Sequence, residues 1–446
     1  MTKPADDGAI ATFEGQFTGH LTSMTLSVSK STDADPAPEG QQFAELVPKS
    51  REVGTASVRL PLPAQSNAVG RMNLSSAIRA PGASKPIELR WLALDAQHQP
   101  IFQRRFDLAP GDKWVRLDEP LHAWRWDNRR VGDWDEVKEI ALVVSSPDVN
   151  RIDLDDVRFT GTESVEDRTK WLLHLAFGDR PIRQAQGDGL LVATDAVDGF
   201  TDADLKRQLE DIRRVRKFIR RVFGDAVRPT DELLAPSPLL IFKNADDYPA
   251  FVAALGRELR VTIEPPRSGG YTVQDISSST YKPELGPRRP VYLHESVHGI
   301  VARDLRLITG HPLHNAMQEG IANYVQICVH PKSLDPAAFK RNFEKPIDAA
   351  GKSFFKPLNV LFANRISTDQ YAQVAGVIAY LIEREPKLLQ ALTKGLADGE
   401  TADNILTAQG KTWQQLEADW LAWGRERYER AGAADAPLFA IPIEFR

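Results

Sequence analysis

The pentapeptide His294-Glu295-Ser296-Val297-His298 contains the residues best suited to chemistry in this chain of 446 residues. Pro290 suits the first turn of a helix, and the apolar residues after it predict that the pentapeptide lies on that helix. At about 100° per residue, two histidines four positions apart project from the same helix face, one turn apart. Their imidazoles can therefore bind one Zn²⁺, and Glu295 stands beside them as a general base for a water on the metal.

A hydrolytic zinc site needs a third protein ligand, and two carboxylates are candidates for it. Asp304 stands six residues after His298. On a continued helix, however, its side chain would lie about 80° from the ligand face and about 9 Å further along the axis. Glu319 lies on a second predicted helix, which can pack across the first and deliver a carboxylate. We therefore predict one zinc ion per chain, held by His294, His298 and Glu319.

The His-Glu-x-x-His helix and the Glu-Gly-Ile-Ala-x-Tyr sequence at 319–324 together resemble the gluzincin branch of zinc metallopeptidases, in particular bacterial peptidase-MA-like domains. Residues 369–381 and 412–420 resemble later helices of that family. The resemblance covers most of residues 187–428. It implies an α+β, mainly helical, zincin-type fold and a zinc-dependent peptidase activity. It also implies that Tyr371 faces the site and hydrogen-bonds the oxyanion of a tetrahedral intermediate.

Several residues near these motifs are further candidates for the site. Asn323, one helical turn after Glu319, could orient that ligand. Gly270 and Tyr271 precede the zinc helix on a predicted edge strand, which could pair with an extended substrate backbone. The single cysteine, Cys328, stands in an apolar run and is predicted to be an inert core thiol.

The first part of the chain has a different pattern, because its apolar residues alternate with a period near two. Ile87-Glu88-Leu89-Arg90-Trp91 and Ile140-Ala141-Leu142-Val143-Val144 are examples. Such alternation places one face of a strand in a core. Turn-rich segments interrupt the pattern, and no long helical stripe is present. An antiparallel β-sandwich is therefore predicted.

The segment 150–159 resembles the last strand of the jelly-roll sandwiches found among carbohydrate-binding modules. That resemblance implies that the sandwich binds a glycan and positions a substrate. Tryptophan rings bind sugars by stacking on their C–H surfaces, so exposed tryptophans would fit this role. Trp124 and Trp126 alternate along the chain and are predicted to form an exposed platform on one side of the sandwich.

The predicted architecture is multidomain. Residues 1–162 form an all-β, jelly-roll-like sandwich similar to carbohydrate-binding modules. Residues 163–188 form a linker with a short helix, because the alternation ends at a polar stretch there. Residues 189–446 form the gluzincin-like metallopeptidase domain, which is α+β and mainly helical.

The composition is that of an ordinary folded protein, with 42% hydrophobic and 26% charged residues. A net charge of −5 gives no positive field for a polyanion, so no nucleic-acid partner is predicted. No apolar stretch reaches the roughly 18 to 20 residues that span a bilayer, and no membrane span is predicted. The first residues lack the apolar core of a signal peptide. The compartment stays open: periplasmic or secreted if a signal peptide has been removed, and cytoplasmic otherwise.

These observations together predict a zinc-dependent hydrolase that cleaves peptide bonds, with protein, peptide, glycoprotein or cell-wall peptide substrates. Endopeptidase and exopeptidase activity are not distinguished. One alternative is a non-catalytic protein that binds glycans or proteins and carries a degenerate peptidase fold. Another is a zinc hydrolase that acts on a non-peptide bond, since its metal site would contain the same residues.

Overall fold

The computed structural model describes residues 9–11, 20–22, 24–30, 42–48, 56–63, 68–127, 131–145, 149–228, 236–264, 268–333, 355–431 and 439–445. The chain divides into two compact units. The first comprises Met1–Asp127, Gly132–Arg168 and Leu255–Thr262, and the second comprises Asn128–Val131, Thr169–Ala254 and Ile263–Arg446. The division after Arg168 lies within the segment 163–188 that was predicted as a linker.

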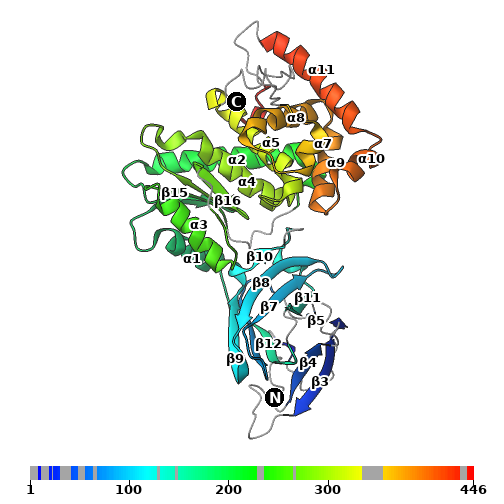
Figure 1. The fold of residues 1–446 in the computed structure, drawn as a ribbon. Helices are drawn as coiled ribbons and strands as arrows, with labels where there is room; N and C mark the ends of the chain where they lie inside the picture. Colours follow the sequence, from blue (N-terminus) through cyan, green and yellow to red (C-terminus); the bar gives the residue numbers. More distant parts are fainter. Residues whose placement is uncertain are drawn as a thin grey trace, which may run out of the picture. The chain divides into compact units, whose positions relative to one another are not determined.

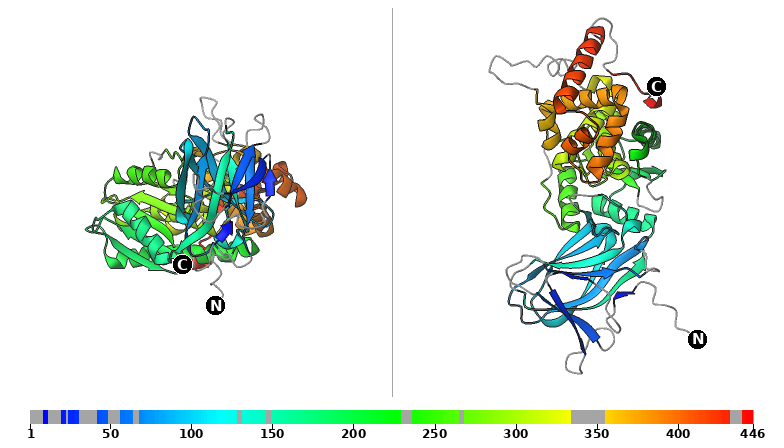
Figure 2. Two further views of the ribbon diagram at one scale, coloured as in Figure 1. Left: turned by 90° about the horizontal axis from the view of Figure 1, so that it is seen from below. Right: turned by 90° about the vertical axis from the view of Figure 1, so that its right-hand side faces the viewer.

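The first unit is a sandwich of two antiparallel β-sheets (Figures 1 and 2). One sheet has the order β3-β4-β12-β6-β9, with β1 paired to β12, and the other has the order β10-β8-β7-β11-β5-β2. The strands are β1 (Ala9–Ala11), β2 (His20–Thr22), β3 (Met24–Lys30), β4 (Gln42–Pro48), β5 (Ala56–Pro61), β6 (Arg71–Ala80), β7 (Ile87–Leu94), β8 (Pro100–Leu108), β9 (Gly111–Pro120), β10 (Arg125–Trp126), β11 (Glu139–Val144) and β12 (Ile152–Thr162). The predicted β-rich fold of this region is therefore confirmed.

The core of the sandwich follows from the alternation in the sequence. Leu89 and Trp91 on β7 are fully buried, and the intervening Arg90 is only half-buried. Leu142 lies opposite Trp91 on the neighbouring strand β11. Leu154 of β12 lies opposite Ile78 of β6 in the other sheet, and both are fully buried. Apolar side chains on the two inner faces thus form one core, as in other sheet-on-sheet packings.

The predicted tryptophan platform is wrong for Trp124, which is only 2% exposed. Its ring packs against that of Trp134, with the ring centroids 5.4 Å apart. Trp126 is half-buried against the same core, and its indole N–H donates to the carbonyl of Gly132 at 3.2 Å. The physical reason is local. Trp124 follows a short 3₁₀ helix (Leu121–Ala123), and the strand β10 begins only at the next residue, so strand alternation does not extend to it.

The second unit is built on a five-stranded sheet in the order β13-β14-β15-β17-β16. The strands are β13 (Arg183–Gly187), β14 (Leu190–Thr194), β15 (Ser237–Phe242), β16 (Gly270–Val273) and β17 (Ile276–Thr280). The three central strands are parallel, and both outer strands are antiparallel to their neighbours. β13 lies inside the segment predicted as a linker. Its polar sequence, Arg-Gln-Ala-Gln-Gly, suits an edge strand and carries no apolar signal.

Among the described residues of this unit, helices cover both faces of the sheet (Figure 1). They are α1 (Val165–Phe177), α2 (Asp202–Phe223), α3 (Asp247–Glu258), α4 (Pro290–Leu305), α5 (Pro312–Val329), α7 (Leu358–Ala363), α8 (Tyr371–Arg384), α9 (Pro386–Ala397), α10 (Ala402–Ala408) and α11 (Trp413–Ala431). Helices α2 and α4 contact the sheet, α5 contacts α4, and α8 contacts α5. On the sheet, Phe242 of β15 contacts Phe177 of α1 and Phe251 of α3.

Helix α2 shows how local sequence signals define these elements. The Thr201 hydroxyl accepts from the backbone N–H of Asp204 at 3.2 Å, and the Asp204 carboxylate accepts from the backbone N–H of Thr201 at 3.0 Å. This reciprocal capping box starts the helix, and Gly224 ends it with a positive φ of 48°. Its apolar residues face the sheet and α4, so the helix becomes one wall of the main core.

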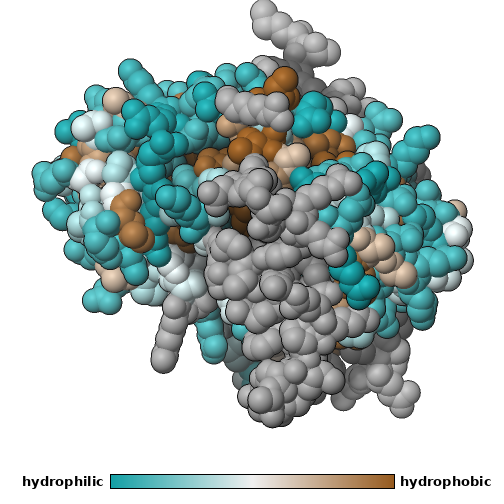
Figure 3. Space-filling model, turned by 90° about the horizontal axis from the view of Figure 1, so that it is seen from above, coloured by the Kyte–Doolittle hydropathy of each residue, from teal (hydrophilic) through white to brown (hydrophobic). Residues whose placement is uncertain are grey.

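The described surface in Figure 3 is mainly hydrophilic, with hydrophobic residues gathered toward the middle of the view. Among the described residues, no helix combines the length and the apolar character that crossing a bilayer requires.

Candidate metal centre

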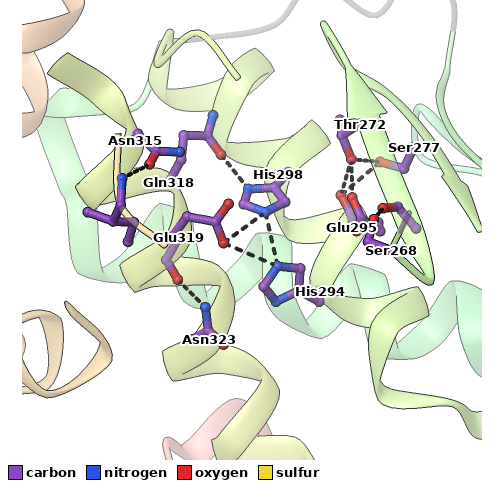
Figure 4. Close-up of polar contacts among 12 residues, drawn as sticks. Ser268, Thr272, Ser277, His294, Glu295, His298, Asn315, Gln318, Glu319 and Asn323 are labelled. Carbon is purple, nitrogen blue, oxygen red and sulfur yellow. Dashed lines mark hydrogen bonds and ion pairs between the residues drawn. The ribbon is translucent and has the colours of Figure 1, made fainter. Parts of the chain in front are cut away.

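Two packed helices, α4 and α5, carry the three predicted zinc ligands. Pro290 occupies the first turn of α4, as predicted, and the helix continues unbroken through both histidines. His294 and His298 project from it one turn apart, and Glu319 points toward them from the middle of α5 (Figure 4). All three side chains are largely buried, because α4 is covered by the sheet on one side and by α5 on another.

The donor atoms of these residues converge on one point. The two histidine Nε2 atoms lie 3.1 Å apart, and Glu319 Oε2 lies 3.4 Å from Nε2 of His294 and 3.6 Å from Nε2 of His298. Ligand atoms around one tetrahedral Zn²⁺, each about 2.0 to 2.1 Å from it, would be about 3.3 Å apart. The observed separations therefore fit a zinc site with two imidazoles and one carboxylate.

Hydrogen bonds set the tautomer of His298. Gln318 Nε2 donates to the carbonyl of Leu307 at 2.6 Å, which fixes the amide so that Oε1 faces the imidazole. Oε1 accepts from Nδ1 of His298 at 2.8 Å, so Nδ1 carries the proton. In the neutral imidazole, the lone pair of Nε2 then points at the convergence point. Gln318 thus orients a ligand from outside the ligand set.

The buried carboxylate of Glu319 lies against the two histidines, with Oε2 at 3.4 and 3.6 Å from their Nε2 atoms. A buried carboxylate is costly unless a cation, either a protonated histidine or a metal ion, lies beside it. The donor set of nitrogen and oxygen lone pairs therefore suits a metal ion such as Zn²⁺.

The ionisable groups of the centre shift one another's pKa values. Burial by itself would lower the pKa of His298, but the nearby carboxylate of Glu319 outweighs burial and raises it to about 9. Burial by itself would raise the pKa of Glu319, but the positive charge on His298 lowers it well below its usual range. Glu319 is therefore ionised at neutral pH, and the cluster attracts a proton or a metal cation.

The predicted general base, Glu295, lies on α4 and contacts the edge strand β16. Thr272 Oγ1 lies 2.8 Å from Oε2 of Glu295, and Ser277 Oγ on β17 donates to the backbone carbonyl of Glu295 at 2.8 Å (Figure 4). Burial raises the pKa of Glu295 above its usual value. A carboxyl group with a raised pKa holds its proton more readily than an exposed one.

Tyr371 lies beside the centre, as the family resemblance implied. It is the first residue of α8, and its ring centroid lies 6.1 Å from that of His294. Burial raises the pKa of Tyr371, and the charge of Glu319 and a hydrogen bond to it raise the pKa further. The hydroxyl therefore stays protonated at neutral pH and can donate a hydrogen bond.

The other candidates take different positions. Asn323 Nδ2 donates to the backbone carbonyl of Glu319 at 2.8 Å, so it supports the helix at that ligand and does not contact the carboxylate. Gly270 and Tyr271 lie on β16, which is an edge strand as predicted. Gly270 faces Glu295, and Tyr271 is half-buried. Substrate binding by these two residues stays a prediction.

Two residues near the motifs lie outside the centre. The carboxylate of Asp304 pairs with the guanidinium of Arg216 at 2.8 and 3.1 Å, so the structure does not bring it to the histidines. Cys328 is 5% exposed, and burial raises its pKa to about 12. A buried thiol with a raised pKa is unreactive, in keeping with the predicted core role.

Thr272 and Gln318 are among the described residues that contact the centre and that sequence reasoning missed. Thr272 stands two positions after Gly270, and side chains two apart on a strand share a face. Gln318 directly precedes Glu319, but nothing in its spacing from His298 predicts that the two meet. The contact of Thr272 thus had a local signal in the sequence, whereas the contact of Gln318 depends on how α5 packs against α4.

No protein family's sequence profile matches the chain, and no curated protein matches it. Solved structures that align with the β-sandwich include a family 11 carbohydrate-binding module from Clostridium thermocellum, in complex with a β-1,3-1,4-mixed-linked tetrasaccharide. That module is 13% identical, with a TM-score of 0.29, and the alignment covers 36% of this chain and 99% of the module.

Two other solved structures are similar at the same level. A family 22 carbohydrate-binding module of Clostridium thermocellum is 15% identical with a TM-score of 0.25, covering 36% of this chain and 99% of the module. An exo-β-agarase is 12% identical with a TM-score of 0.28, covering 42% of this chain and 36% of the agarase. The chain is thus similar, over its β-rich part, to carbohydrate-binding modules, and it continues into a helical region.

Proposed function

We propose that this protein is a zinc-dependent hydrolase that cleaves peptide bonds through a gluzincin-like site in its second unit. The observation that supports the proposal is the convergence of His294 Nε2, His298 Nε2 and Glu319 Oε2, at 3.1 to 3.6 Å from one another, on two packed helices. Three protein ligands leave one tetrahedral position open, as catalytic zinc sites do. A structural zinc site would instead use four protein ligands.

The residues of the site divide the chemistry among them. Zinc, when bound, would polarise a substrate carbonyl and lower the pKa of a water molecule. Glu295 takes the proton from the attacking water and returns it to the leaving amine. The hydroxyl of Tyr371 donates a hydrogen bond to the oxygen on which negative charge develops. Gln318 holds the His298 ring in the orientation that the ligand set requires.

Metal content and hydrolysis, measured together, test the proposal. Zinc per chain is measured by elemental mass spectrometry on the wild type, the His294→Ala/His298→Ala double variant and Glu295→Gln. The same samples are incubated with a panel of proteins, glycoproteins and peptidoglycan peptides, and products are identified by mass spectrometry. We expect about one zinc in the wild type, none in the double variant, and full zinc without cleavage in Glu295→Gln.

The panel also separates the alternatives. Cleavage of a glycosidic or another non-peptide bond in these substrates, with every peptide bond intact, would identify a zinc hydrolase of a different bond. A wild type that binds no zinc after reconstitution would contradict the enzymatic function, and binding by the sandwich would become the principal candidate.

Glycan binding by the β-sandwich is a separate candidate function. Among the tryptophans of this unit, Trp91, Trp124 and Trp134 are buried, whereas Trp114 and Trp126 keep partial exposure. The guanidinium of Arg79 lies over one face of the Trp114 ring, 4.5 Å from its centroid, so a sugar would have to use the remaining exposed surface. Affinity electrophoresis of the whole protein in gels with soluble polysaccharides tests this function. Retardation that Trp114→Ala or Trp126→Ala removes would support it, and equal mobility in every gel would contradict it.

A further inference from the structure

Two hydroxyl groups lie close to Glu295. Each can donate one hydrogen bond, so their distances show which one donates to the carboxylate. Thr272 Oγ1 lies 2.8 Å from the carboxylate Oε2 and 3.1 Å from the backbone carbonyl oxygen of Glu295. Ser277 Oγ lies 2.8 Å from the same carbonyl oxygen and 3.3 Å from Thr272 Oγ1. Each hydroxyl has one proton. The shorter contacts pair Ser277 with the carbonyl, so the proton of Thr272 goes to Oε2.

The strand that carries Thr272 also makes room for the base. A Cβ at Gly270 would lie 2.6 Å from Cγ of Glu295 and 2.9 Å from its Oε1, which is closer than atoms can approach. Only glycine therefore fits at this position while Glu295 keeps its orientation. Gly270 and Thr272 are two positions apart and both face α4. On the edge strand β16, Gly270 thus leaves space for the Glu295 side chain, and Thr272 donates a hydrogen bond to it.

We propose that Thr272 is the positioning residue of the general base: its hydroxyl donates to Oε2 of Glu295 and fixes the orientation of the carboxyl group. This inference rests on the proposed function. A hydroxyl that donates to a carboxyl oxygen restricts the rotation of that group, and the hydrogen bond is stronger when the group is ionised. Both Thr272 and Ser277 are almost fully buried, so water does not compete for these contacts. The base is therefore set in place by β16 before a substrate binds.

Three variants test the assignment. Thr272→Val keeps the shape of the side chain and removes the hydroxyl, and Thr272→Ser keeps the hydroxyl and removes a methyl group. Ser279→Ala is the matched control, because Ser279 is an equally buried hydroxyl on β17 whose hydrogen bond goes to the carbonyl of Gly269 and not to Glu295. Each zinc-loaded protein is assayed for zinc per chain, for binding of acetohydroxamate by calorimetry, and for kcat and KM on fluorescent casein.

Acetohydroxamate gives a readout that does not need turnover, because a hydroxamic acid passes its proton to a neighbouring carboxylate when it binds a zinc site. We expect Thr272→Val to keep its zinc and to bind acetohydroxamate about 10-fold more weakly. Its kcat should fall about 10- to 100-fold with KM unchanged. This is the fold-change that corresponds to the loss of one hydrogen bond to a charged group. Thr272→Ser should stay within about threefold of the wild type, and Ser279→Ala should match it.

The outcomes separate the inference from the function on which it rests. Thr272→Val with wild-type affinity for acetohydroxamate would overturn the inference alone, as would a Thr272→Ser variant as impaired as Thr272→Val. Loss of zinc from Thr272→Val would show a structural role and would also overturn it. A wild type that binds neither zinc nor acetohydroxamate would instead overturn the proposed function, and the inference with it.

Discussion

The substitution Gln318→Leu gives the sharpest test of the metal centre. Gln318 is 1% exposed and makes two hydrogen bonds, one from His298 Nδ1 at 2.8 Å and one to the Leu307 carbonyl at 2.6 Å. Leucine has a similar volume but can make neither bond. The imidazole of His298 would then be free to rotate and to change its tautomer, and the ligand would no longer be held for zinc.

The size of the effect follows from these two bonds. Loss of a hydrogen bond that orients a metal ligand weakens metal affinity about 10- to 100-fold, which is about 1.4 to 2.8 kcal/mol. The substitution also leaves a buried N–H and a buried carbonyl without partners. Each unsatisfied group costs about 1 to 3 kcal/mol of folding stability, so the metal-free protein should be destabilised as well.

A second buried glutamine separates the two effects. Gln373 is also 1% exposed, and its amide accepts from Lys356 N at 3.1 Å and donates to Lys356 O at 2.6 Å, with no contact to the centre. Gln373→Leu should lose comparable stability in urea unfolding and keep its zinc affinity. Affinities are measured by competition with a chromophoric chelator. Equal zinc affinities in the Gln318→Leu and Gln373→Leu variants would refute the reasoning.

Three further predictions concern stability. His314 is buried and neutral, with Nδ1 accepting from Ile308 N at 2.7 Å and Nε2 donating to Leu396 O at 3.1 Å. Burial lowers its pKa from 6.5 to about 3. The unfolded state therefore binds the extra proton between these values, and stability is lost as the pH falls below about 6.5, by about 2 kcal/mol at pH 5. Urea unfolding against pH should show this slope, and a His314→Gln variant with an undiminished slope would contradict it. Gly320→Ala should destabilise the protein by about 1 to 3 kcal/mol, because the Cβ of the alanine would lie 2.6 Å from Ile378 Cγ1 and 3.1 Å from the backbone oxygen of Val374. An unchanged free energy of unfolding in urea would contradict this packing. Chelation of zinc should lower the melting temperature by roughly 5 to 10 °C in differential scanning calorimetry, and an unchanged value would indicate that no stabilising metal was bound.

Local sequence rules were sufficient for the features that depend on neighbours along the chain. The position of Pro290 in the first turn of its helix and the one-turn spacing of His294 and His298 follow from helix geometry alone. The buried alternation around Trp91 follows from strand geometry in the same way. These features need no knowledge of which elements pack together, and the structure contains each of them where the sequence predicts it.

Only the tertiary structure decided which distant residues meet. The convergence of Glu319 with the histidines and the contact of Gln318 with His298 both depend on the packing of α5 against α4. The contact of Thr272 with Glu295 depends on the position of β16 against α4. The burial of Trp124 depends on the 3₁₀ turn before it and on its contact with Trp134. The physical reason is the same in each case: spacing along one helix or strand fixes the direction of a side chain, whereas its partners are set by how separate elements pack.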